Sequence, residues 1–223
     1  MNSANIEKKV TIVDYGMGNL FSIENAVRNC GSIPIRTSCP EEIACSERII
    51  LPGVGAFGLG MSELSQKGLI EPIKAFSDQG NPVLGICLGM QLLFTKSGEF
   101  GEHEGLNIIP GKISPIPEFN HRGIASLVPH VGWNELLLPE QKQQDFWQNT
   151  ILKDVPVGSS VYFVHSFFAD DVNTLYDISD CEYNEIRMPS VVKFNNTFGC
   201  QFHPEKSGPI GLKILKNFLS FSR

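Results

Sequence analysis

Short apolar runs alternate with amphipathic segments along the first half of the chain. Such runs, often rich in β-branched residues, are typical of buried strands. They occupy residues 10–13, 32–36, 49–51 and 82–86. Apolar positions three and four residues apart predict helices over residues 23–30 and 69–77, which Gly31 and Gly80 end. This alternation of strand and helix favours a mostly parallel, doubly wound sheet that is flanked by helices.

The second half of the chain has a different pattern. Residues 110–120 are rich in proline and glycine. Residues 136–149 are polar, so we expect a surface excursion there. The predicted elements are a strand over residues 160–168, a hairpin of residues 190–194 and 197–202, and a helix over residues 214–219. The hairpin predicts an antiparallel extension of the sheet. Since no linker divides the chain, we expect one α/β domain over residues 1–223.

The composition excludes several classes of protein. With 42% hydrophobic and 19% charged residues, the chain has the profile of an ordinary globular protein. The formal net charge of -6 disfavours a nucleic-acid partner, and no apolar stretch is long enough to cross a membrane. The N-terminal residues show no signal peptide, and the six cysteines lack C-x-x-C spacing. These features favour a cytoplasmic protein with free thiols.

One cysteine stands at a position that suits a nucleophile. Gly85 and Gly89 flank Cys87 two residues before and two residues after, at the junction of an apolar run and an amphipathic segment. This is the nucleophile-elbow pattern G-x-S-x-G with sulfur in place of oxygen, in which a strand turns abruptly into a helix. The helix N-terminus would favour a thiolate. The pattern alone fits a buried structural cysteine about equally well.

A cysteine nucleophile needs a base, and the base needs an orienting group. His203 ends a predicted strand, and Glu205 lies two residues further on, so an extended backbone places both side chains on one side. His165 is the rival base; it has no acid next to it in sequence, although Asp170 and Asp171 could reach it. The histidines have no metal-ligand spacing, so we expect no catalytic metal.

Two glycine-rich loops follow predicted strands. The Gly16-x-Gly18 pair suggests a dinucleotide fingerprint, but Phe21 stands where close helix packing needs a small residue, which disfavours a nucleotide. Residues 52–58 lack the ending of a phosphate-binding loop. Their backbone N–H groups suit an anion at the carboxyl end of a strand, although an ordinary turn has the same composition.

Five motifs in order carry a resemblance to a known family. They are residues 14–20, 51–57, 85–91, 129–134 and 201–208. Together they resemble the triad-type, class I glutamine amidotransferases, and most of all the glutaminase subunits of imidazole glycerol phosphate synthase. The resemblance extends over residues 10–219.

The resemblance implies a role for each group of residues. The implied sites are the catalytic triad Cys87, His203 and Glu205; the oxyanion donors Gly53, Val54, Gly55 and Leu88; the glutamine-binding residues Gln91, Glu99, His165, Ser166 and Phe167; and the partner interface with its channel, Asn19, His130, Trp133, Asn134 and Lys206. The implied activity is hydrolysis of glutamine without a cofactor. The ammonia would pass to a (β/α)8-barrel synthase subunit, whose contact face would include Asn19, Trp133 and Lys206.

The chain departs from the family pattern at three places, which leaves the ammonia acceptor open. Gly98 stands where many members have an acid, and phenylalanines occupy positions 167 and 168 where tyrosine is usual. Residues 181–186 are more similar to paralogues that supply ammonia for amidino sugars in surface polysaccharides. A free-standing cysteine hydrolase would use the same triad, and a non-catalytic binding module would need no triad at all.

Overall fold

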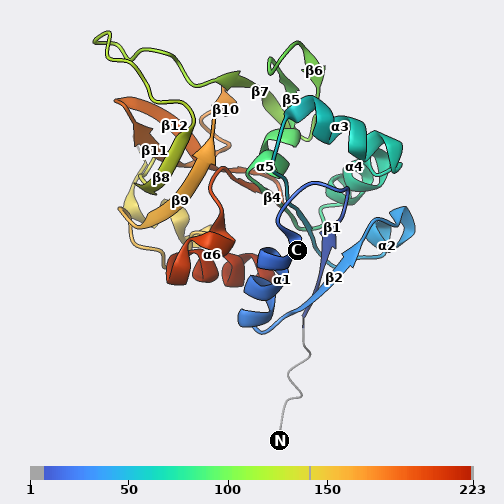
Figure 1. Ribbon diagram of the computed structural model, residues 1–223. Coiled ribbons are helices and arrows are strands. Elements are labelled where there is room, and N and C mark those ends of the chain that lie inside the picture. Colours follow the sequence, from blue (N-terminus) through green and yellow to red (C-terminus); the bar gives the residue numbers. More distant parts are fainter. Residues whose placement is uncertain (1–7, 141, 222–223) are drawn as a thin grey trace, which may run out of the picture.

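A seven-stranded sheet forms the centre of the computed structural model, which describes residues 8–140 and 142–221 (Figure 1). Residues 1–7, to which the signal-peptide expectation mostly applies, lie outside this range. In spatial order the strands are β11 (Asp177–Tyr183), β12 (Ile186–Phe194), β13 (Thr197–Cys200), β4 (Val83–Ile86), β3 (Ile49–Leu51), β1 (Lys9–Val13) and β2 (Ile33–Thr37). The pairs from β13 to β2 are parallel, whereas β11–β12 and β12–β13 are antiparallel. The predicted mostly parallel sheet with an antiparallel extension is confirmed.

Helices cover both faces of this sheet. They are α1 (Leu20–Asn29), α2 (Pro40–Ala44), α3 (Phe57–Gln66), α4 (Ile70–Asp78), α5 (Leu88–Leu92) and α6 (Gly208–Ser220), with short 3-10 turns η1 (Gln144–Asn149) and η2 (Pro204–Lys206). Ile12 packs in one apolar layer with α1 and α6, and its neighbour Val13 packs in the other layer with α3 and α4. Successive side chains of a strand point to opposite faces, so one short strand contributes to both layers.

A smaller sheet and a two-stranded ribbon extend from the centre. The smaller sheet contains β10 (Phe167–Asp170), β7 (Ile109–Pro115), β5 (Phe94–Ser97) and β6 (His103–Glu104), and the ribbon pairs β8 (His130–Glu135) with β9 (Ser160–His165). The strand predicted over residues 160–168 is therefore two strands in different sheets. The chain changes sheets at Ser166, because β9 pairs with β8 and β10 pairs with β7.

Other features of these regions were not predicted from the sequence. Residues 110–120 contain most of β7, and their glycine and proline do not prevent pairing with β10. The segment over residues 136–149 buries Leu136 and Trp147, and the Trp147 Nε1 donates to the Ile178 carbonyl at 2.7 Å. Helix α3 was not predicted, because glycines interrupt its pattern and its N-cap residue makes no side-chain cap. Within residues 8–140 and 142–221, no helix is both long and apolar enough to span a membrane.

Candidate active site

Cys87 lies at a sharp turn between β4 and α5. Its backbone has φ 53° and ψ -110°, a conformation that non-glycine residues adopt rarely and that marks functional sites. A Cβ at Gly89 would lie 1.8 Å from the Leu51 carbonyl oxygen, and one at Gly85 would lie 2.7 Å from the Gly89 oxygen. The two glycines of the motif are therefore needed for close backbone approach, and the turn places the thiol at the carboxyl end of the sheet.

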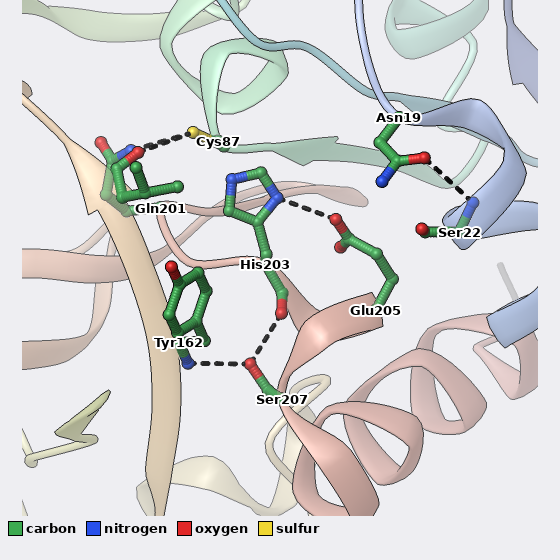
Figure 2. Close-up of polar contacts among 9 residues, drawn as sticks. Asn19, Ser22, Cys87, Tyr162, Gln201, His203, Glu205 and Ser207 are labelled. Atoms are coloured by element: carbon green, nitrogen blue, oxygen red, sulfur yellow. Dashed lines mark hydrogen bonds and ion pairs between the residues drawn. The ribbon is translucent and has the colours of Figure 1, made fainter. Parts of the chain in front are cut away.

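His203 follows β13, the parallel neighbour of β4. Its Nδ1 lies 2.8 Å from Glu205 Oε1, and both side chains are buried (Figure 2). His203 Nε2 has no hydrogen-bond partner in the described part of the chain. Burial opposes the charged imidazolium, but the neighbouring Cys87 and Glu205 outweigh it and raise the pKa of His203 to about 9. The pair is therefore suited to hold a proton close to the thiol.

Ser207 anchors the backbone of this segment. Its Oγ donates to the His203 carbonyl at 2.7 Å and accepts from the Tyr162 N–H at 2.9 Å (Figure 2). The His203 N–H in turn donates to the Tyr162 carbonyl at 2.9 Å. These bonds fix the turn after β13 to strand β9, so the backbone of His203 is held at both its N–H and its carbonyl.

Cys87 and His203 open into a cavity of about 380 Å³. Its lining also includes Val54, Gly55, Leu88, Gln91, Glu99, Pro129, Val164, His165, Ser166 and Phe167. The size lies in the range for a small-molecule site. The Glu99 Oε2 accepts from the Phe57 N–H at 2.5 Å, which supplies the missing cap of α3 from a residue distant in sequence. The structure thus gathers nearly all the residues predicted for chemistry and glutamine binding around one cavity.

His165 has other partners than a nucleophile. Its Nδ1 lies 2.9 Å from the Phe167 carbonyl, and its Nε2 lies 3.1 Å from His130 Nδ1. Burial lowers the pKa of His165 to about 3 and that of His130 to about 4. His130 stacks between Phe163 and Tyr183. His130 is 3% exposed, and its assignment to the partner interface and its channel stays a prediction.

The predicted oxyanion loop is held from below by Tyr15. The buried Tyr15 hydroxyl donates to the Pro52 carbonyl at 2.7 Å. Gly53 packs so closely that a Cβ there would lie 2.4 Å from that hydroxyl, and Gly55 adopts φ 112°. Val54 and Gly55 line the cavity, whereas Gly53 lies beneath the start of α5. Sequence reasoning assigned Tyr15 no role in holding this loop, because only the fold brings the two motifs together.

The residues predicted to meet a partner differ in exposure. Asn19, Trp133 and Lys206 are exposed, Trp133 to 59%. The Asn19 side chain also accepts from the Ser22 N–H at the start of α1 (Figure 2). Asn134 is half-buried and donates to the Glu182 carbonyl at 2.8 Å. Three of the predicted contact residues are thus free to touch another molecule, and Asn134 contributes to the ribbon's own packing.

Sequence reasoning missed Gln201, which the structure places beside the thiol. Its Nε2 lies 3.9 Å from Cys87 Sγ (Figure 2). A signal was present, because Gln201 and His203 are two residues apart on an extended segment and share one side of it. Among the described residues, no group of three or more potential metal ligands lies close together.

Comparison with known proteins agrees with this geometry. Residues 11–220 match the family model of the class-I glutamine amidotransferases. The chain is 47% identical over 210 residues to imidazole glycerol phosphate synthase subunit HisH 1 of Legionella pneumophila strain Paris, covering 94% of this chain and 98% of that protein. It is 46% identical to the HisH subunit of Caldanaerobacter subterraneus, with 94% and 96% covered.

Solved structures show the same fold at low sequence identity. A crystal structure titled glutamine amidotransferase aligns with a TM-score of 0.70 at 14% identity, covering 94% of this chain and 96% of that one. PurLQS from Thermotoga maritima contains a chain that aligns with a TM-score of 0.67 at 17% identity, with 96% and 98% covered. Given the family match over residues 11–220 and the two relatives above, the chain belongs to the class-I glutamine amidotransferase family, and within it to the HisH family of enzyme subunits.

Proposed function

We propose that this chain hydrolyses glutamine through a Cys87–His203–Glu205 triad and delivers the ammonia to a HisF-like (β/α)8-barrel subunit. The observation that carries the proposal is the 2.8 Å His203–Glu205 pair, set beside a thiol at a strained elbow in one cavity. The barrel would use the ammonia to form imidazole glycerol phosphate in histidine biosynthesis. The whole chain would act as one cytoplasmic domain with its partner in a heterodimer.

The geometry suggests the order of the chemical steps. Cys87 Sγ attacks the side-chain amide carbon of glutamine, and its proton resides on His203 Nε2. His203 returns this proton to the leaving nitrogen, which departs as ammonia and leaves a thioester on Cys87. Water then attacks the thioester, with His203 as the base, and releases glutamate. Glu205 accepts from the Nδ1 proton throughout, which fixes the ring and stabilises the imidazolium.

We expect two groups of backbone N–H donors to stabilise the oxyanion. The first is the Leu88 N–H at the start of α5, and the second is the loop of Gly53, Val54 and Gly55. Removing one such donor costs about 10²- to 10³-fold in rate in a well-studied protease. At the other end of the cavity, Gln91, Glu99 and residues 165–167 would hold the amino-acid end of glutamine.

The decisive experiment separates ammonia production from ammonia use. We expect Cys87→Ala to abolish glutamine-dependent synthesis by the complex with the barrel subunit. Synthesis from added ammonium salts should persist, since the acceptor site lies on the partner. Binding of the barrel, measured by calorimetry, should match the parent. Glutamine-dependent synthesis by Cys87→Ala would refute the proposed nucleophile.

The segment in which the chain is more similar to the amidino-sugar paralogues packs against the long connection between β7 and β8. The segment over residues 181–186 joins β11 to β12, and there the Tyr183 hydroxyl donates to the Leu127 carbonyl at 2.6 Å. Arg122 and Glu185 pair at 3.1 Å, so this turn supports the long connection between β7 and β8 (Figure 1). Pro129 at the end of that connection lines the cavity.

The two acceptors can be told apart directly. Glutaminase activity is measured with a barrel subunit of the histidine pathway and with one from amidino-sugar synthesis. Stimulation by the first alone supports the proposed pathway. Stimulation by the second alone would assign the chain to surface-polysaccharide synthesis and leave the triad chemistry unchanged.

A further inference from the structure

Two polar groups other than His203 approach the Cys87 sulfur. The Val164 carbonyl lies 3.7 Å from Sγ, and Gln201 Nε2 lies 3.9 Å from it. Gln201 is 1% exposed, so water does not compete for its amide. A carbonyl can only accept a hydrogen bond, whereas an amide nitrogen can only donate one. The two groups therefore suit different protonation states of the sulfur.

The direction in which the Gln201 amide points follows from a chain of unambiguous contacts. The Phe167 carbonyl can only accept, so Gln91 must direct its amino group there, at 2.9 Å. The same Gln91 Nε2 donates its other hydrogen to Gln201 Oε1 at 3.0 Å. With Oε1 occupied in this way, Gln201 directs its N–H group at the sulfur. A flipped Gln201 would place two donors against each other.

The neighbouring histidines have a defined direction for the same reason. His165 Nδ1 must carry a proton, because it faces the same Phe167 carbonyl. Its Nε2 is then an acceptor, and His130 Nδ1 is the donor to it. The Phe167 carbonyl thus receives hydrogen bonds from both Gln91 and His165. Two donors therefore hold the Phe167 carbonyl, from which the orientations of Gln91 and then Gln201 follow.

We propose that Gln201 is a further residue of the reaction, whose amide N–H stabilises the thiolate of Cys87 and is aimed there by Gln91. The neutral thiol donates its proton toward the Val164 carbonyl. Once the proton leaves, that carbonyl offers nothing to the sulfur, and the Gln201 N–H becomes a charge-assisted donor. The role rests on the proposed function only in assigning Cys87 as the nucleophile.

The test measures the ionisation of Cys87 itself. The rate of its alkylation by iodoacetamide, followed on the Cys87 peptide by mass spectrometry, is recorded from pH 5 to 10. Gln201→Met keeps the length of the side chain and removes the donor. We expect the midpoint of the alkylation profile to rise by about one pH unit, since a charged hydrogen bond is lost. Gln148→Met makes the same change at an exposed site and should leave the profile unchanged.

A second variant secures the result. Gln201→Glu keeps the shape but places an oxygen toward the sulfur, and we expect its midpoint to rise at least as far. If Gln201→Met lacks the parent's circular dichroism spectrum, the result is taken from Gln201→Glu. A folded variant with the parent's midpoint overturns the proposal. Failure of the proposed function has a different signature, which is a parent that is alkylated at Cys87 but does not hydrolyse glutamine with its partner.

Discussion

Two buried histidines line the cavity around Cys87, and they have opposite proton affinities. The pKa of His203 is raised to about 9, whereas that of His165 is lowered to about 3. Burial favours the neutral form in both cases. The difference lies in the partners, since His203 faces the Cys87 sulfur and a buried carboxylate, whereas His165 faces a carbonyl and a neutral imidazole. The Cys87 sulfur and the Glu205 carboxylate together outweigh the cost of burying the charged His203 ring.

The two histidines also differ in whether both of their ring nitrogens are hydrogen-bonded. His203 leaves Nε2 without a partner in the described residues, so that atom is available for exchange with the thiol. Both ring nitrogens of His165 are occupied, and its ring bonds to strand β8 and to the start of β10. In the proposed function the His203 side of the cavity would supply the chemistry, and the His165 side would define the shape of the cavity.

The largest expected effect tests this contrast directly. His203→Ala should lower kcat for glutamine hydrolysis by about 10³-fold or more, because triad members act as a unit. His165→Asn retains an amide donor for the Phe167 carbonyl, and we expect kcat to fall by less than about tenfold. Steady-state glutaminase assays with the barrel partner measure both. Equal losses in the two variants would contradict the assignment of His203 as the base.

Removing the carboxylate should have the next largest effect. Glu205→Gln keeps a group near His203 Nδ1 but removes its charge, and we expect kcat to fall by about 10²-fold. The pKa of His203 should fall below the parent's value of about 9, because the carboxylate no longer stabilises the imidazolium. A nuclear magnetic resonance titration of the ring protons measures this shift. An unchanged titration would show that Glu205 does not tune the base.

The two histidines on the His165 side of the cavity, His165 and His130, should make the fold less stable at acid pH. Both of its histidines have folded pKa values below the unfolded value, at about 3 and about 4. Below pH 6.5 the unfolded chain binds more protons, so each neutral histidine lowers the stability by about 1.4 kcal/mol per pH unit until its folded pKa is reached. The free energy of unfolding of the parent protein should therefore fall as the pH falls from 6.5 toward 4.

The variant His130→Phe tests the part of this acid destabilisation that comes from His130. The variant keeps a ring between Phe163 and Tyr183 but leaves His165 Nε2 unpaired, so at pH 7.5 it should be less stable by about 1–2 kcal/mol. It also lacks one neutral histidine, so its deficit should shrink by about 2 kcal/mol between pH 6.5 and 4.5. Urea unfolding at both pH values measures the difference. A deficit that grows on acidification would mean that His130 is charged in the fold.

The sequence predicts the local parts of this site better than the distant ones. The Cys87 elbow and the His203–Glu205 spacing are visible because each lies within five residues of chain. The partners of His165 are not, since His130 lies 35 residues away and only the β8–β9 ribbon brings them together. The contacts of Gln201 with Gln91 and Cys87 are also distant in sequence, although its spacing from His203 places both side chains on one side of the segment.

The fold shows the same division. Strand β3 and helix α4 were predicted to within a residue, because β3 is a continuous apolar run and the apolar positions of α4 recur at helical spacing. Helix α3 was not predicted because its N-terminus is capped by Glu99, which lies 42 residues from Phe57 and so leaves no capping signal in the local sequence. The break at Ser166 depends on which strands pair with each half, and strand pairing is not written in either segment alone.

The smallest expected effect concerns the proposed partner face, which would include residues from both sides of the cavity. Trp133 lies opposite Tyr162 on the β8–β9 ribbon, the side of His165, whereas Lys206 directly follows Glu205 on the side of His203. If the barrel covers both, Trp133→Ala and Lys206→Ala should each weaken binding or stimulation by about tenfold, as for a buried interface residue.

Leu175→Ala removes an apolar group exposed to 71% outside this face and serves as the control. Calorimetry gives the affinity, and glutaminase assays with an acceptor analogue give the stimulation. Because alkylation of Cys87 reports the isolated chain, its rate should stay at the parent's value in all three variants. Parental affinity and stimulation in both interface variants would move the barrel to another surface.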